Sequence, residues 1–166
     1  MPPRSAIRHA ALFLFLLLML GCCILPAVAA ASTAPAARYG ELKEAVTRLK
    51  ADARRSQWRA PWEELAATFE RLAEGNPRWK NAPAALFRAA QCREELSRRS
   101  LLKADRLKAA RQYCAVAERH PHSVLADDAL LAAARLYAGP LKDWNTAAAL
   151  LDAIESRYPR GDMLGA

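Results

Sequence analysis

Residues 126–159 read ADDALLAAARLYAGPLKDWNTAAALLDAIESRYP, and this stretch decides the fold class. Its apolar residues recur every three or four positions on both sides of Gly139-Pro140, as Ala126, Leu130, Ala133, Tyr137 and then Ala147, Leu150, Leu151, Ile154, Tyr158. This spacing places apolar side chains on one face of an α-helix. Asp143 stands at the expected N-cap and Pro159 at the expected end of the second helix. The stretch therefore predicts two helices joined by a turn.

Working outward, the same spacing predicts four earlier helices, with apolar stripes over 42–53, 62–72, 85–96 and 107–117. We expect Pro61 at the start of the second helix, Asn81 as the N-cap of the third, and a long connector over Ser97–Asp105. The composition agrees with a helical fold. Of the 166 residues, 38 are Ala, and only eight residues after position 31 are β-branched. Strands favour β-branched residues, whereas Ala and Leu favour helices, so the sequence predicts an all-α fold.

The helices also show an internal repeat. Counting back eight residues from Pro77, Pro121 and Pro159 gives a large residue each time, namely Phe69, Tyr113 and Leu151. Apolar residues recur at five and twelve residues before each proline. This pattern resembles the tetratricopeptide repeat, whose unit has the 34-residue length of 126–159. The resemblance implies a right-handed solenoid of about three antiparallel helix pairs over residues 39–159. An unrelated helical bundle is the alternative.

Three phrases carry a narrower resemblance: EELSRRS (94–100), HPHSVLADD (120–128) and YPRGDM (158–163). They look like the exported helical-repeat region that precedes the catalytic domain in some bacterial N-acetylmuramoyl-L-alanine amidases. The resemblance implies a non-catalytic periplasmic scaffold that positions or regulates a peptidoglycan amidase. The catalytic domain of those zinc enzymes has no counterpart here. The alternative function is a cell-envelope assembly adaptor or lipoprotein of the helical-repeat type.

The first 31 residues have the order of a secretory signal peptide. Arg4 and Arg8 precede an unbroken apolar run over 10–20, and the small residues 27–31 follow. The expected product is exported and periplasmic, with 32–38 as a flexible connector and 160–166 as a tail. A retained anchor and lipidation at Cys22 are the alternatives. Removal of the signal lowers the net charge from +8 to +6, so the basic character belongs to the mature domain.

Two cysteines, Cys92 and Cys114, remain after export. They lie on apolar stripes on either side of the expected connector. An oxidising compartment permits a disulfide between them. The alternative is a pair of buried, reduced cysteines.

A basic and aromatic surface is the main binding candidate. Its residues are Arg54, Arg55, Trp58, Arg59, Trp79, Arg98 and Arg99. Such charge suits anionic lipid, wall polymer or a protein or peptide partner, for example a cell-wall hydrolase domain. Export makes nucleic acid an unexpected partner, and membrane contact is expected only through the signal or a lipid anchor. Ordinary solvated helix faces are the alternative interpretation.

No motif for catalysis or cofactor binding is recognisable. His120 and His122 flank Pro121 without a third metal ligand at a suitable spacing. The pairs Glu63-Glu64 and Glu94-Glu95 are adjacent on a helix and therefore diverge by about 100°, so we interpret them as solvated residues. We expect no enzymatic activity, metal or cofactor for this chain.

Overall fold

The structure is a computed structural model that describes residues 34–159. The chain divides into the units Met1–Ala34 and Pro35–Ala166, and the described residues belong almost entirely to the second. They form six α-helices and one short 3-10 helix and contain no strand: α2 (Pro35–Ala51), η2 (Arg55–Gln57), α3 (Arg59–Glu74), α4 (Ala82–Ser100), α5 (Lys103–Arg119), α6 (Ala126–Ala138) and α7 (Trp144–Arg157). The all-α prediction is confirmed.

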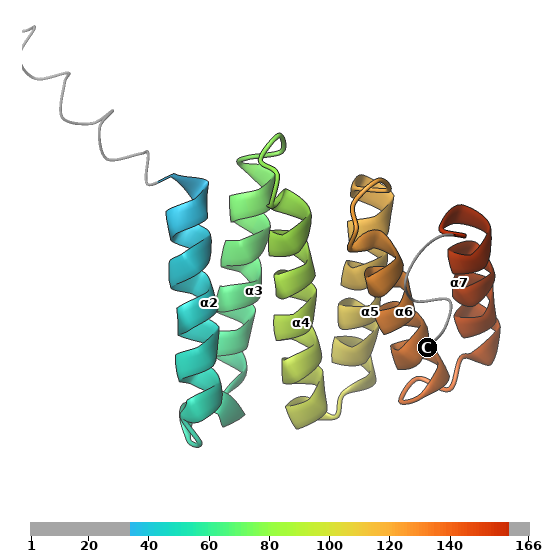
Figure 1. The fold of residues 1–166 in the computed structure, drawn as a ribbon. Coiled ribbons are helices and arrows are strands. Elements are labelled where there is room, and N and C mark those ends of the chain that lie inside the picture. Colours follow the sequence, from blue (N-terminus) through green and yellow to red (C-terminus); the bar gives the residue numbers. More distant parts are fainter. Residues whose placement is uncertain (1–33, 160–166) are drawn as a thin grey trace, which may run out of the picture. The chain divides into compact units, whose positions relative to one another are not determined.

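Each helix packs mainly against the next one in the chain. Successive helices run in opposite directions, as Figure 1 shows, and the extensive contacts join α3 to α4, α4 to α5, α5 to α6 and α6 to α7. The contact between α2 and α3 is smaller. The hydrophobic core is therefore distributed over successive helix interfaces.

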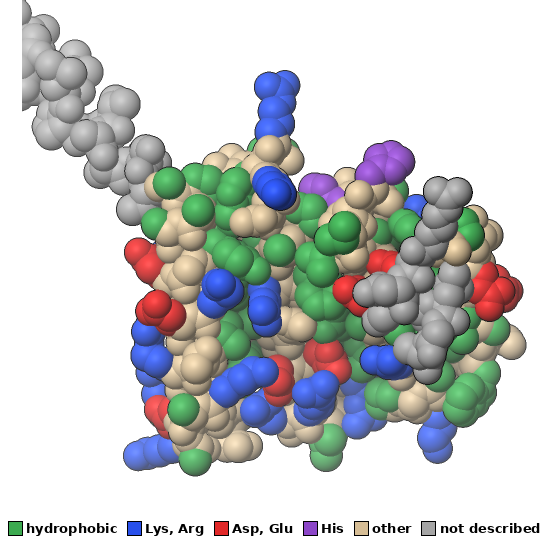
Figure 2. All heavy atoms as spheres, in the orientation of Figure 1, with side chains coloured by type: hydrophobic (Ala, Val, Ile, Leu, Met, Phe, Trp, Pro, Cys, Tyr) green, Lys and Arg blue, Asp and Glu red, His purple; other side chains and the backbone are tan. Residues whose placement is uncertain are grey.

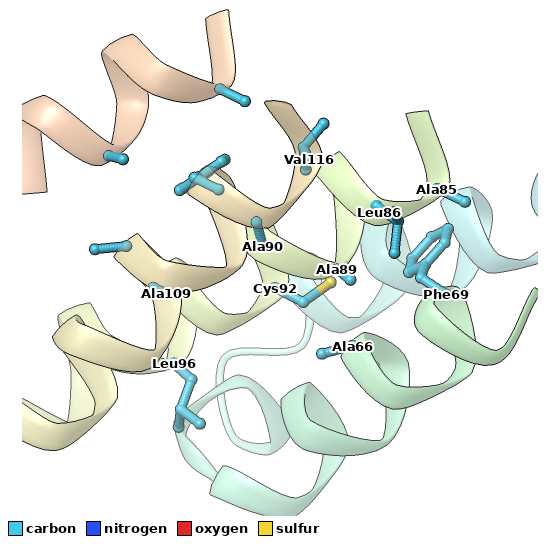
Figure 3. Close-up of a cluster of buried hydrophobic side chains, with 14 of the residues drawn as sticks. Ala66, Phe69, Ala85, Leu86, Ala89, Ala90, Cys92, Leu96, Ala109 and Val116 are labelled. Carbon is cyan, nitrogen blue, oxygen red and sulfur yellow. The ribbon is translucent and has the colours of Figure 1, made fainter. Parts of the chain in front are cut away.

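Alanine dominates these interfaces. In α4 the side chains of Ala85, Ala89 and Ala90 are fully buried, and Ala66 of α3 and Ala109 of α5 are buried against the same core (Figure 3). A methyl side chain lets two helices approach closely and loses no rotamer freedom on burial. The alanine content seen in the sequence thus sets the spacing of the helices.

A few large side chains fill the remaining volume. Trp62 is fully buried, and its indole Nε1 donates a hydrogen bond to the Ser56 carbonyl at 2.8 Å. That bond satisfies the polar atom of a buried indole and ties η2 to α3. Tyr39 of α2 makes an edge contact with the ring of Phe69, with the centroids 5.9 Å apart, and this contact helps to attach α2.

The structure differs from the sequence-based boundaries at the starts of α2 and α3. Helix α2 begins at Pro35, so residues 35–38 are helical and do not belong to a connector over 32–38. Pro is compatible with a first helical turn because its missing N–H has no partner there. Helix α3 begins at Arg59, two residues before Pro61. Asn81 occupies the N-cap position of α4 without a side-chain bond, whereas the Asp143 cap is confirmed by its bond from the Thr146 N–H at 3.1 Å.

The prediction of a long connector over Ser97–Asp105 was wrong. Helix α4 continues to Ser100 and α5 begins at Lys103, so only Leu101 and Leu102 lie between them. Leu101 has a φ of 57° and is therefore in the left-handed conformation. This conformation often ends a helix, but the residue that adopts it is usually glycine. Most of the residues predicted to form the connector therefore belong to the end of α4 and the start of α5.

Leu151, the third large residue of the predicted repeat pattern, differs in exposure from Phe69 and Tyr113. Phe69 and Tyr113 are buried, because α4 and α6 follow the helices that carry them, but Leu151 is 44% exposed. No described helix follows α7, so nothing within residues 34–159 covers this position.

One ion pair lies within the α3–α4 interface. The Nη2 atom of Arg93 is 2.7 Å from both carboxylate oxygens of Glu70. Arg93 is buried, and its Nε atom has no hydrogen-bond partner. Loss of the carboxylate would leave a buried guanidinium without its counter-charge, which is the costly way to break such a pair.

We therefore predict that Glu70→Ala lowers the free energy of unfolding by about 2 kcal/mol. The double variant Glu70→Leu/Arg93→Met should recover most of this loss, because it removes both charges and keeps apolar volume. Urea denaturation followed by circular dichroism measures both values. Equal losses in the single and double variants would show that the charge imbalance is not the cause.

Candidate functional site

A groove lies between α4 and α6 and is lined by apolar and polar side chains. Its volume is about 600 Å³, and its lining includes Phe87, Gln91 and Glu94 of α4, Tyr113 of α5, and Leu131 and Arg135 of α6. Figure 2 shows hydrophobic side chains at the surface between α4 and α6. Apolar volume with a few polar groups at its edges is the usual make-up of a binding site.

The Tyr113 ring is held in one orientation in this groove. It makes an edge contact with Phe87, with the centroids 5.3 Å apart, and its hydroxyl donates a 2.7 Å hydrogen bond to Glu94. Burial, together with the neighbouring Glu94 carboxylate, raises the pKa of Tyr113 far above its ordinary value. The phenol therefore stays neutral, and its bond to Glu94 fixes the buried ring beneath the groove.

The groove also carries basic side chains on each of its three helices. Arg98 of α4 is 2.6 Å from Glu94, and Arg106 of α5 donates to the Pro140 carbonyl at 3.3 Å. Arg135 of α6 lies on the groove and is exposed. A peptide in this groove would meet apolar groups at its centre and arginines at its margin.

The sequence missed most of this groove. Phe87, Gln91 and Arg135 belong to no recognisable sequence motif. They line one groove only because the fold brings α4 and α6 together. Glu94 was interpreted as a solvated residue, but it accepts bonds from Tyr113 and Arg98. The four-residue spacing of Glu94 and Arg98 was the available signal for that ion pair.

The residues of the predicted basic and aromatic surface separate into two groups. Arg54, Arg55, Trp58 and Arg59 lie at the start of α3, at the end of the helices where α4 finishes with Arg98 and Arg99. Trp79 precedes α4 at the opposite end. Its ring packs on Tyr39, with the centroids 5.5 Å apart, so Trp79 anchors α2 and does not join the other six residues.

Arg59 links two of the turns at that end. Its guanidinium binds the Asp105 carboxylate with two bonds, of 3.0 and 2.6 Å, and the Ser100 hydroxyl donates to the same carboxylate at 2.6 Å. The bond from Arg59, with the help of Ser100, holds the pKa of Asp105 below its ordinary value. The two-bond geometry is specific for a planar guanidinium, and it connects the start of α3 to the start of α5.

Arg99 and Lys50 join a second cluster around Glu95. Glu95 accepts from Arg99 at 2.8 Å and lies 2.6 Å from Lys50 of α2. Burial alone would raise the pKa of Glu95, but the bonds from Arg99 and Lys50 outweigh it and hold the pKa below its ordinary value. The guanidinium of Arg99 also lies 4.7 Å from the Trp62 ring centroid. Arg99 therefore contacts Glu95 and Trp62 within the chain.

Cys92 and Cys114, the candidates for a disulfide, are free thiols in the structure. Their electrostatic neighbours differ, since Cys92 lies near Lys50 of α2 and Cys114 near Tyr137 of α6. Cys92 is buried in the main hydrophobic core, and Cys114 is half-buried against the same core. Burial raises the pKa of the Cys92 thiol to about 12 and also raises that of Cys114.

The remaining sequence candidates are not assembled into a chemical site. His122 is exposed, and burial lowers the pKa of His120. Within residues 34–159 no group of three or more His, Cys, Asp or Glu side chains is arranged to hold a metal ion. Three of the predicted features lie outside the described residues: Cys22, the signal segment 1–31 and the tail 160–166.

Comparisons with protein-family models, with curated proteins and with solved structures found no match to this chain. None of the described helices is long and apolar enough to span a membrane.

The Arg59–Asp105 contact predicts a pH dependence. Because the pKa of Asp105 is lower in the folded chain, its contribution to stability is present above the ordinary value of 3.8 and is lost as the pH falls through the folded value. Asp105→Asn should therefore lower the melting temperature at pH 7 and have little effect near pH 2. Thermal melts across this pH range measure the difference. An equal effect at both ends would contradict the ion-pair explanation.

The thiol environments predict an order of reactivity. At neutral pH, iodoacetamide should leave Cys92 unmodified in the folded chain, because its thiolate is hardly populated, and should modify the half-buried Cys114 slowly. Both should react after unfolding. Peptide mass mapping provides the measurement. A Cys92–Cys114 cross-linked peptide in untreated protein would contradict the free-thiol arrangement.

Proposed function

We propose that residues 39–159 form a right-handed solenoid of three antiparallel helix pairs that acts as a non-catalytic periplasmic interaction scaffold. The pairs would be α2 with α3, α4 with α5, and α6 with α7. The partner would be a peptide segment of another envelope protein, and a peptidoglycan amidase domain is the first candidate. The partner class rests on the resemblance in the sequence.

The packing order supports the solenoid. In repeat proteins each helix contacts its neighbours in the chain, and distant helices scarcely touch. The described helices show this order. The repeat positions Phe69 and Tyr113 are both buried on the second helix of their pairs, as equivalent positions of one repeat unit would be.

The groove between α4 and α6 is the observation that carries the binding role. Its lining comes from the first helices of two successive pairs, with Tyr113 from the helix between them. Phe87 and Leu131 offer apolar contacts, and Arg135 offers a polar contact to a peptide backbone or side chain, whereas Tyr113 is buried beneath them and bonded to Glu94. A side chain held in place before binding loses little entropy when the partner arrives, and Tyr113 is held in this way.

Photo-crosslinking can test the scaffold role in the envelope of the producing cell. Benzoylphenylalanine replaces Leu131 in the groove or, as the control, Thr68 on α3. A specific protein should crosslink through position 131 and not through position 68. Titration calorimetry with that purified protein should then show at least about tenfold weaker binding for Arg135→Glu, which corresponds to one charge-assisted contact.

Arg71→Glu on α3 is the matched control, because it makes the same charge change outside the groove. Its binding should equal that of the unmodified chain. If no protein crosslinks through position 131, or if both charge reversals weaken binding equally, the groove is not the partner site. Binding of a protein unrelated to amidases would support the scaffold and exclude the amidase assignment.

A further inference from the structure

Three turns at one end of the helices expose large apolar side chains. Trp58 precedes α3, Leu101 and Leu102 join α4 to α5, and Trp144 begins α7; their exposed fractions are 52%, 66%, 53% and 67%. Figure 1 places these turns at the same end, because successive helices alternate in direction. We call residues 52–59, 100–106 and 140–144 the turn surface.

Contacts between the turns show that this surface is continuous. Arg59 binds Asp105 and so joins the first turn to the second. Arg106 donates to the Pro140 carbonyl and joins the second to the third. The ammonium of Lys103 is also close enough to Asp143 to lower the pKa of that carboxyl, after the larger effect of the Thr146 bonds.

The turn surface is basic, and its acids are already engaged. It contains six basic residues and three acidic ones, a net charge of +3. Asp52 accepts the N–H groups of Arg54 and Arg55, Asp105 binds Arg59, and Asp143 caps α7. Among the described residues no carboxylate forms an ion pair with Arg54, Arg55, Lys103 or Lys142.

The turns at the opposite end of the helices are equally basic but expose far fewer large apolar side chains. Its turns, 75–81 and 119–125, also have a net charge of +3 from Arg78, Lys80 and Arg119, but Val124 is their one exposed large apolar residue. Charge alone therefore does not distinguish the two ends. The turn surface alone combines charge with two exposed indoles and two exposed leucines, and Figure 2 shows basic and hydrophobic side chains along this lower edge.

We propose that the turn surface docks on an anionic phospholipid bilayer. Indole rings favour the headgroup region, where an apolar body and a polar N–H are both accommodated. Leucines at the tips of turns can enter the acyl boundary, and nearby Lys and Arg bind anionic headgroups. The sequence predicted a basic surface suited to anionic lipid among other partners, but membrane contact only through the signal or a lipid anchor, so docking of this surface on a bilayer goes beyond that prediction. The turn surface meets the groove at Leu101, Arg106 and Pro140, but the scaffold role does not require membrane docking.

Tryptophan quenching by brominated lipid measures this docking. The full chain is mixed with vesicles of phosphatidylcholine alone, or with added phosphatidylglycerol, both containing brominated acyl chains. Trp58 and Trp144 should be quenched when phosphatidylglycerol is present, whereas the buried Trp62 should not. The variant Trp58→Phe/Trp144→Phe should abolish the lipid-dependent change. Residues 1–33 are the same in every variant, so differences between variants report the turn surface.

Two charge variants then locate the docking surface. Each basic residue near an anionic membrane strengthens binding by about fivefold, so Arg54→Ala/Arg55→Ala should lower the docking constant by about 25-fold. Arg78→Ala/Lys80→Ala removes the same charge from the other end. That end is about 25 Å away along a 17-residue helix such as α5, beyond the screening length, so the change should be less than about twofold.

An apolar variant completes the test. Leu101→Ser/Leu102→Ser should reduce quenching without changing the net charge, with circular dichroism to show that the fold is retained. The proposal is overturned if anionic vesicles cause no quenching, if neutral vesicles quench equally, or if the two charge variants weaken docking to the same extent. Retention on acidic polyglutamate without quenching by vesicles would also overturn it.

Discussion

The burial of alanine in the core between successive helices is the constraint on which the rest of the structure depends. Ala66, Ala89 and Ala109 are fully buried on three consecutive helices, where a larger residue would force the helices apart. Each alanine buries only a small apolar surface area. The free energy of unfolding must therefore come from many such contacts, repeated along the whole row of helices. Trp62, Phe69 and Tyr113 add the few large volumes that fix the register of neighbouring helices.

Charged residues then divide into those that hold helices together and those that face solvent. Glu70, Glu95 and Asp105 each bind a cation on another helix, and these contacts span the joins from α2 to α5. By contrast, Arg98 at the groove margin pairs with Glu94 and Glu95 of its own helix, and Arg54 and Arg55 of the turn surface form no ion pair among the described residues. The two proposed interaction surfaces are defined by this difference, which net charge alone does not show.

The sequence predicted the helical class well because helix periodicity and alanine content are local signals. The Asp143 cap was also predicted, since its partner is three residues away. The α4–α5 connector was mispredicted because Leu101 adopts a left-handed conformation normally associated with glycine. The groove could not be predicted, because Phe87 and Leu131 meet only through packing. Likewise, the packing of the Arg99 guanidinium on the Trp62 ring depends on a contact between residues far apart in the sequence.

Native-state hydrogen exchange tests the central claim that successive alanine-lined interfaces carry the stability of the proposed helix stack. Helices α2 and α7 each have one packed neighbour, whereas α3, α4 and α5 lie between two. Terminal units of such a stack open locally before the centre unfolds. The amides of α2 and α7 should therefore exchange at a lower free energy of opening than those of α4. A single opening free energy shared by all six helices would contradict the account and indicate one cooperative bundle.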